Sequence, residues 1–204
     1  MKSATTPLAL RRWHFTVAIF FLLLALFLDG WILSRMPPEG TQFGDLYHLL
    51  RSLGYLPTWI SFALIYTLAA TNEQRISRRS GAISIVFTAA GSGIVAAILK
   101  VMIRRLDPQT GYEGDWNFAP WDGNWWDGTD LCFPSEHAAV AWGAAIAISR
   151  RWPGSAPLML LLAAGCACGR VLARGHNPSD VVASLLLALI VSHWIDRCPT
   201  PQVS

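Results

Sequence analysis

The sequence predicts an all-α membrane protein, built as a bundle of six transmembrane helices. Composition is the first observation behind this prediction, because 53% of the 204 residues are hydrophobic and only 14% are charged, unlike an average soluble domain. The second is the pattern of the chain, in which long apolar runs alternate with short polar or turn-forming segments. We therefore expect one membrane domain over residues 1–204, with the lipid bilayer as its partner and no role in binding nucleic acid.

Each apolar run predicts one span, and the expected spans lie near residues 15–33, 56–71, 82–103, 137–149, 156–172 and 178–195. Several runs fall short of the roughly 20 residues that cross the hydrocarbon core. Spans two, four and six should therefore extend into flanking polar residues that other helices cover. The first run follows basic residues like a secretory signal, but no small-residue cleavage pattern follows it, so we interpret it as a retained helix. A short amphipathic pattern at residues 46–50 is expected to lie along the interface, with His48 at the surface.

Basic residues near the span ends predict the orientation of the bundle. If the six helices alternate, three basic groups fall on one side, namely Lys2 with Arg11 and Arg12, Arg75 with Arg78 and Arg79, and Arg150 with Arg151. That side is expected to be the cytoplasm, with both termini there. The ends of spans three and five and the starts of spans four and six then share the extracytoplasmic face, where their polar clusters can meet.

The start of the sixth span carries the most informative cluster, in which Arg170, His176 and Asp180 follow the spacing R-x-x-x-x-x-H-x-x-x-D. Asn177 can cap the span, and Pro178 suits its first turn. The Asp180 carboxylate can then reach back to Nδ1 of His176, which leaves Nε2 unprotonated for attack on phosphorus. We therefore expect His176 to be a nucleophile, beside a helix N-terminus that favours an anion.

The start of the fourth span supplies a second histidine. Ser135 is placed to cap this span and to offer its hydroxyl or backbone N–H to a phosphate oxygen. His137, in the first turn, can protonate a leaving oxygen and later activate water. The sequence thus predicts an acid and base, His137, that works with the nucleophile of the sixth span.

Cations from the third and fifth spans are expected to bind the phosphate oxygens, because charge-assisted hydrogen bonds suit an anion. Lys100 and Arg170 are two of them, and one of the pair Arg104 and Arg105 is the third. We prefer Arg104, because Lys100, Arg104 and Asp107 would share one helical face at i, i+4 and i+7.

In their order and spacing these clusters resemble the three motifs of the lipid phosphate phosphatase family, also called the type 2 phosphatidic acid phosphatase superfamily. Those motifs read K-x-x-x-x-x-x-R-P, P-S-G-H and S-R-x-x-x-x-x-H-x-x-x-D, and the resemblance covers roughly residues 100–180. It points to the bacterial integral-membrane branch. It implies an all-helical membrane fold, a reaction without metal or other cofactor, and a phosphohistidine on His176. Asp180 would orient that histidine, and His137 would serve the leaving group.

Three positions depart from the family pattern. Asp107 stands where the first motif has arginine, and Gly169 stands in place of the serine of the third motif. Glu136 replaces the glycine of P-S-G-H, where its carboxylate could repel phosphate, pair with Arg104 or Arg105, or help to select a substrate. Arg105 and Arg174 are the other residues that we expect to take part in such selection.

The predicted outer loop, residues 107–131, is rich in tryptophan and in acidic residues and contains no lysine or arginine. Tryptophan suits the headgroup region of a membrane, so we expect a lid that lies at the interface. The clustered aspartates leave a calcium site open as an alternative, although their spacing does not match an EF-hand loop. The four cysteines suggest packing residues rather than a disulfide framework, and no zinc motif is present in the sequence.

These features predict an enzyme that hydrolyses a phosphomonoester or diphosphate of a membrane lipid at the extracytoplasmic face. Undecaprenyl diphosphate, phosphatidylglycerol phosphate, phosphatidic acid and the phosphates of lipid A are all candidate substrates. A phosphotransferase that moves the phosphoryl group from His176 to another lipid would use the same residues. A non-catalytic bundle that binds or transports lipids is the alternative from another class of protein, since ionisable residues inside membranes also serve transport.

Overall fold

The computed structural model describes residues 12–38, 41, 43–110, 116–123 and 126–197, and within these residues the regular structure is helical. The α-helices, in chain order, are α1 (Arg12–Leu33), α2 (Asp45–Ser52), α3 (Leu56–Leu68), α4 (Arg75–Ile103), α5 (Glu136–Arg151), α6 (Ala156–Leu172) and α7 (Pro178–Arg197). Two short 3-10 turns, η1 (Pro108–Thr110) and η2 (Pro153–Ser155), lie between them. The predicted all-α class is confirmed, and the short amphipathic pattern forms a helix of its own, α2.

Four helical segments are long and apolar enough to cross a membrane, which marks the chain as a membrane protein. They are Trp13–Leu33, Arg75–Ile103, Pro153–Leu172 and Pro178–Arg197. The helices at expected spans two and four are shorter than a membrane crossing needs. α3 has 13 residues and α5 has 16, against the roughly 20 that cross the hydrocarbon core. At 1.5 Å per residue, a helix of this length rises only about 20–24 Å, less than the roughly 30 Å of the hydrocarbon core.

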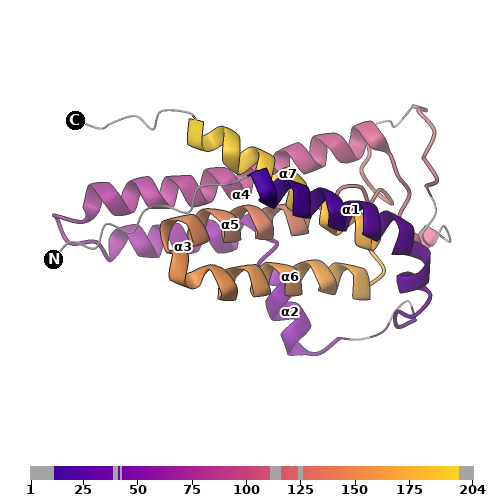
Figure 1. Cartoon of the computed structure of the whole chain (residues 1–204), viewed down its shortest axis with the longest axis horizontal. Coiled ribbons are helices and arrows are strands. Elements are labelled where there is room, and N and C mark those ends of the chain that lie inside the picture. Colours follow the sequence, from indigo (N-terminus) through magenta and orange to yellow (C-terminus); the bar gives the residue numbers. More distant parts are fainter. Residues whose placement is uncertain (1–11, 39–40, 42, 111–115, 124–125, 198–204) are drawn as a thin grey trace.

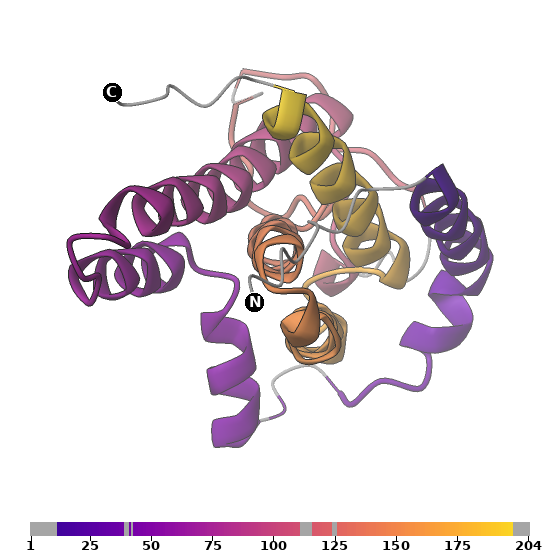
Figure 2. The ribbon, with the colours of Figure 1, turned by 60° about the vertical axis from the view of Figure 1, so that its left-hand side comes forward.

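α5 lies at the centre of the bundle and packs against α4, α6 and α7 (Figure 2). Eleven of its sixteen residues are buried, and most of these are alanine. At Gly143 the approach of α4 is so close that a Cβ atom would lie 2.7 Å from the Thr88 carbonyl oxygen and from Ser92 Oγ. Small residues allow helix backbones to approach in this way. The position of α5 explains why this helix need not be as apolar or as long as a lipid-facing span.

Successive long helices run in opposite directions, so the end of α4, the start of α5, the end of α6 and the start of α7 gather at one end of the bundle (Figure 1, right). A hydrogen bond from the Ser135 backbone N–H to the Asp180 carbonyl oxygen, 3.3 Å long, joins the starts of α5 and α7 there. The prediction that these four ends share one face is therefore confirmed. We call this end of the bundle the site end.

The outward faces of α1 and α3 are apolar and exposed. Phe27 of α1 is 85% exposed, and Leu68 of α3 is 75% exposed. Large apolar side chains exposed along the face of a helix are typical of contact with lipid. α2 instead crosses α6 steeply (Figure 1), and its Leu50 side chain packs on Gly165 of α6.

Candidate functional site

His176 lies in the loop between α6 and α7, where it is only 3% exposed. Its Nδ1 lies 2.8 Å from the Cys132 carbonyl oxygen, whereas the nearest Asp180 oxygen is 3.9 Å away. The expected hydrogen bond between His176 and Asp180 is therefore wrong. Because a carbonyl oxygen can only accept a hydrogen bond, Nδ1 carries the proton and Nε2 is left unprotonated. The sequence predicted the same protonation state, but with Asp180 as the partner of Nδ1. No side-chain motif could have revealed a backbone carbonyl.

Asp180 fixes the start of α7 instead. Its Oδ2 accepts a 2.6 Å hydrogen bond from the Asn177 backbone N–H and a 3.2 Å bond from the Asn177 side-chain amide. A side chain in the third helical position that reaches back to the N-cap N–H is one half of a capping box. The carboxylate therefore shapes the turn that carries His176, without touching its ring closely.

Arg105 lies in a network that joins three distant segments and has no exposed surface. Its guanidinium donates to Asp180 Oδ1 at 2.7 Å, to Ser179 Oγ at 2.7 Å and to Asp29 Oδ2 at 2.9 Å. These bonds and its complete burial give Arg105 a structural role, and its expected part in substrate selection stays a prediction. Asp29 of α1 was missed, although a carboxylate inside an apolar run is itself a signal of a special environment.

Arg104 does not stand on the helical face that the sequence analysis gave it. α4 ends at Ile103, and Arg104 adopts the left-handed conformation with φ of 59°. Its Nε donates to the Ala119 carbonyl oxygen at 3.3 Å, and its guanidinium lies 5.5 Å from the Trp121 ring centroid. Arg104 thus fastens the outer loop to the end of α4. The expectation that it shares a helical face with Lys100 and Asp107 is wrong, because the helix ends before it.

Lys100, in the last turn of α4, pairs with Glu136 in the first turn of α5 at 2.6 Å. One outcome expected for Glu136 was pairing with Arg104 or Arg105, but its partner is Lys100. The carboxylate is 42% exposed, and the lysine side chain is 14% exposed. The outer loop also passes close by, since a Cβ atom on Gly128 would lie 3.7 Å from Lys100 Cδ. An anion that reaches this lysine has to compete with a partly exposed carboxylate.

His137 lies in the first turn of α5, beside the segment that follows α2. Its ring meets the Tyr55 ring edge to face, with 4.8 Å between centroids. Its Nε2 is buried and has no hydrogen-bond partner. Ser135 caps the helix as predicted, since its hydroxyl accepts from the Ala138 backbone N–H at 3.4 Å. Because the Ser135 backbone N–H already donates to Asp180, only its hydroxyl proton is left for a phosphate oxygen.

Arg170, in the last turn of α6, has a buried Nε without a hydrogen-bond partner. Its guanidinium packs on the loop, so closely that a Cβ atom on Gly175 would lie 2.8 Å from Nη2. The pKa of His176 lies well below its usual value, first because the ring is buried, and then because of the charges of Arg170, Lys100 and His137. The two histidines and two of the expected cations thus lie within electrostatic range of one another.

Arg174, the remaining residue expected to select a substrate, holds the chain together at the site end. Its guanidinium donates to the carbonyl oxygens of Pro37 at 2.8 Å, Leu33 at 3.1 Å and Met36 at 3.3 Å. These bonds tie the loop before α7 to the end of α1. They give Arg174 a positioning role, and its expected part in substrate selection stays a prediction.

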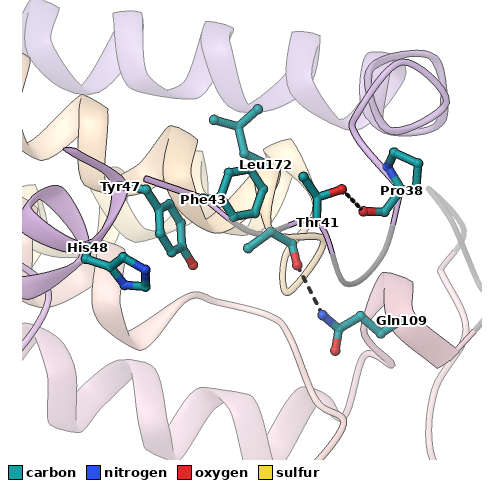
Figure 3. A pocket seen from close by; sticks show the side chains of 8 residues that line it. Pro38, Thr41, Phe43, Tyr47, His48, Gln109 and Leu172 are labelled. Carbon is teal, nitrogen blue, oxygen red and sulfur yellow. Dashed lines mark hydrogen bonds between the residues drawn. The ribbon is translucent and has the colours of Figure 1, made fainter. Parts of the chain in front are cut away.

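Two cavities open near these residues. One, of about 410 Å³, is lined by aromatic and uncharged polar side chains together with His48 (Figure 3), and Gln109 closes one side by donating to the Ala173 carbonyl oxygen at 3.1 Å (Figure 3). The other, of about 320 Å³, is lined by Glu136, His137 and apolar residues of α4 and of the start of α3. The second cavity gives the His137 side of the site access to the surroundings.

The outer loop is described only in part. Trp116 packs against Phe133, with ring centroids 5.2 Å apart, and Trp121 and Trp126 are largely exposed. The expected contributions of Glu113, Asp115 and Trp125 lie outside the described residues. Among the residues that are described, no group of three or more histidine, cysteine, aspartate or glutamate side chains could hold a metal ion. The three described cysteines are free. Cys132 and Cys166 are buried, as expected of packing residues, whereas Cys168 is exposed, and Cys198 lies outside the described part.

Fold and site together define an all-helical membrane protein with His176 buried at one end of the bundle, near His137, Lys100 and Arg170. A family model described as the PAP2 superfamily matches residues 81–203, more than half of the chain. The chain therefore belongs to the PAP2 superfamily, as its motifs indicated, and this membership implies phosphatase-type activity. No curated protein matches the chain. No solved structure matches it either.

Proposed function

We propose that this chain is a membrane-lipid phosphatase, which hydrolyses a phosphomonoester or diphosphate of a lipid through a phosphohistidine on His176. The observation that carries the proposal is the hydrogen bond from His176 Nδ1 to a backbone carbonyl. It leaves Nε2 with a free lone pair in a buried site near Lys100 and Arg170. A neutral imidazole beside cations suits attack on an anionic phosphorus centre.

The proposed reaction has two steps. Lys100, Arg170 and the Ser135 hydroxyl bind the non-bridging oxygens while His176 Nε2 bonds to phosphorus, and the bond from phosphorus to the leaving oxygen breaks. His137 gives that oxygen a proton. Water then attacks the phosphohistidine, His137 takes a proton from the water, and inorganic phosphate leaves. Asp180 acts indirectly in both steps, by fixing the turn before α7.

The side of the membrane and the lipid are parts of the same proposal. The positive-inside rule favours an extracytoplasmic site in a bacterial inner membrane, because the basic groups Arg75 to Arg79 and Arg150 to Arg151 lie at the end of the bundle opposite the site (Figure 1). Undecaprenyl diphosphate, phosphatidylglycerol phosphate, phosphatidic acid and the phosphates of lipid A fit this location. A lipid acceptor in place of water would make the same site a phosphotransferase.

A non-catalytic bundle that binds or transports lipids is the second candidate function. The ion pair of Lys100 with Glu136 favours it, because this pair occupies a cation that a phosphate would need. The two candidates differ in their need for His176 as a nucleophile, and that difference can be measured.

The test is His176→Ala in the purified full-length protein, with release of inorganic phosphate measured over a panel of the four lipids. We expect kcat to fall by at least about a thousandfold, because the attacking atom is gone. His14→Ala is the matched control, since His14 stacks on Trp13 in the first turn of α1, whereas the last turn of that helix lies at the site end.

Each other outcome has a distinct meaning. Phosphate release that survives His176→Ala would overturn the proposed mechanism. Transfer to a second lipid without release of phosphate would identify a phosphotransferase. A wild-type protein that releases phosphate from none of the four lipids would support the non-catalytic bundle.

A further inference from the structure

Arg51, in the last turn of α2, is a cation that the sequence analysis did not assign to the site. Its Nε is buried and has no hydrogen-bond partner. Its guanidinium carbon lies 5.9 Å from the centroid of the Tyr55 ring, and the same ring meets His137 edge to face. Arg51 and His137 therefore share one aromatic neighbour.

The backbone after α2 presses this segment against the start of α5. Gly54 lies so close to His137 that a Cβ atom on the glycine would stand 2.7 Å from His137 Cβ. α2 itself is held by Leu50, which fits against Gly165 of α6. Arg51 lies in the chain between Leu50 and Gly54. Packing at both of these residues therefore holds the backbone that carries Arg51 close to the start of α5.

The cations divide between the two histidines. Arg51 shares the Tyr55 ring with His137, whereas Lys100 lies at the end of α4 and Arg170 packs on the loop that carries His176. Because His137 is the proposed acid at the leaving oxygen, this arrangement puts Arg51 on the side of the leaving group. Arg104 and Arg105, the other arginines that the sequence offered, are held by the outer loop and by the buried network.

We propose that Arg51 binds the second phosphate of a lipid diphosphate, and that a lipid diphosphate is therefore the substrate class of this site. The inference rests on the proposed function, with His176 as nucleophile and His137 at the leaving oxygen. The leaving group of a monoester is a neutral alcohol, which has no charge for a guanidinium to bind. The leaving group of a diphosphate is a phosphate, whose oxygens suit the fork of an arginine.

The chemistry balances for this substrate. His176 Nε2 bonds to the terminal phosphorus, and the bond from that phosphorus to the bridging oxygen breaks. The electron pair stays on the bridging oxygen, which takes a proton from His137, and the charge that remains on the lipid monophosphate lies beside Arg51. Water then attacks the phosphohistidine, and His137 recovers a proton. The products are lipid monophosphate and inorganic phosphate.

The test compares farnesyl diphosphate with farnesyl monophosphate as probes, using the purified full-length protein in detergent. We expect wild type to prefer the diphosphate. Arg51→Gln should lower kcat/KM for the diphosphate by about tenfold or more, because one charge-assisted contact is lost. The value for the monophosphate should change by less than about threefold. Arg51→Lys should fall between wild type and Arg51→Gln, and Arg79→Gln, at the exposed far end of α4, is the control.

Equal losses for the two probes, or a wild type without preference for the diphosphate, would overturn the inference. A binding measurement separates it from the proposed function. Inorganic diphosphate and inorganic phosphate should each raise the unfolding temperature, with the larger shift from diphosphate, and Arg51→Gln should remove that difference. If these shifts are observed but the wild-type protein releases no phosphate from any lipid, the phosphatase proposal fails and the binding role of Arg51 stands. If neither binding nor turnover depends on Arg51, the role fails.

Discussion

Arg105 joins the end of α4 to α1 and to the start of α7 through two carboxylates. Each carboxylate has further support, since Asp29 accepts from the Ser179 backbone N–H at 2.8 Å and Asp180 accepts from Asn177. A buried ion pair contributes little relative to an apolar replacement of both partners, but loss of one partner leaves an uncompensated charge. In this network the arginine is the shared partner, so the three residues are not equivalent.

This asymmetry predicts different costs for two substitutions. Arg105→Met leaves two carboxylates close together without a cation and should destabilise the protein by roughly 3–5 kcal/mol. Asp29→Asn keeps the pair of Arg105 with Asp180 and a polar side chain in place, and should cost about 1–3 kcal/mol. Denaturant unfolding in mixed micelles measures both. A smaller loss for Arg105→Met than for Asp29→Asn would contradict this description of the network.

Single residues also show what the sequence can and cannot reveal. Lys100, His137, Arg170 and His176 could be proposed from the sequence because their residue types and spacing suit phosphate chemistry, and their roles stay predictions. Arg51 was missed, since nothing in the sequence of a short surface helix says which helix it will cross. The role of Asp180 was mistaken for a related reason: its distance from His176 along the chain allowed a direct bond, and only the fold directs its carboxylate to Asn177 and Arg105.

At the scale of elements, the contact between the segment after α2 and the start of α5 controls the position of His137. This contact needs a residue without a side chain at position 54. α2 is only eight residues long, too short to be stable alone, so it depends on this contact and on α6. The segment from α2 to Gly54 therefore couples the packing of α2 on α6 to the position of His137.

Gly54→Ala should lower kcat by about tenfold or more, because its methyl group would displace His137, and small errors in the position of a catalytic group are costly. Gly44→Ala is the matched control, since a Cβ atom there meets nothing within 4 Å. Phosphate release and the unfolding temperature should be measured for both. The idea fails if Gly54→Ala keeps full activity, or if Gly44→Ala loses as much activity.

The elements themselves could be predicted well from the sequence where apolar length decides. The six runs became α1, α3, α4, α5, α6 and α7, with ends within a few residues of those expected in most cases. The end of α4 shows the limit. The expected helical face runs past Ile103, but Arg104 is left-handed, and its side chain binds the outer loop at Ala119. Such a tertiary contact leaves no trace in local periodicity.

For the whole molecule, the division of charge between the two ends predicts sidedness. Arg151 and Ser77 are hydrogen-bonded at the end opposite the site, and Arg150 pairs there with Asp196. The outer loop, with its exposed tryptophans, lies at the site end. The positive-inside rule therefore assigns the two ends to different compartments.

Cysteine labelling in intact cells tests this assignment. In a background with Cys168 and Cys198 replaced by serine, Asp122→Cys at the site end should react with a membrane-impermeant thiol reagent. Arg79→Cys should react only after the cells are opened. Both positions are exposed in the structure, so a lack of labelling reports sidedness rather than burial. Labelling of Arg79→Cys alone in intact cells would invert the proposed orientation.

The partner of His176 Nδ1 is a main-chain oxygen, that of Cys132. A codon change at position 132 can alter the thiol, but every amino acid that replaces it brings the same carbonyl. A point mutation at position 132 therefore keeps the acceptor that holds the proton on Nδ1 of His176. A carboxylate acceptor would be lost when its residue is replaced. A change of the side chain at position 132 should therefore leave the protonation pattern of His176 as it is.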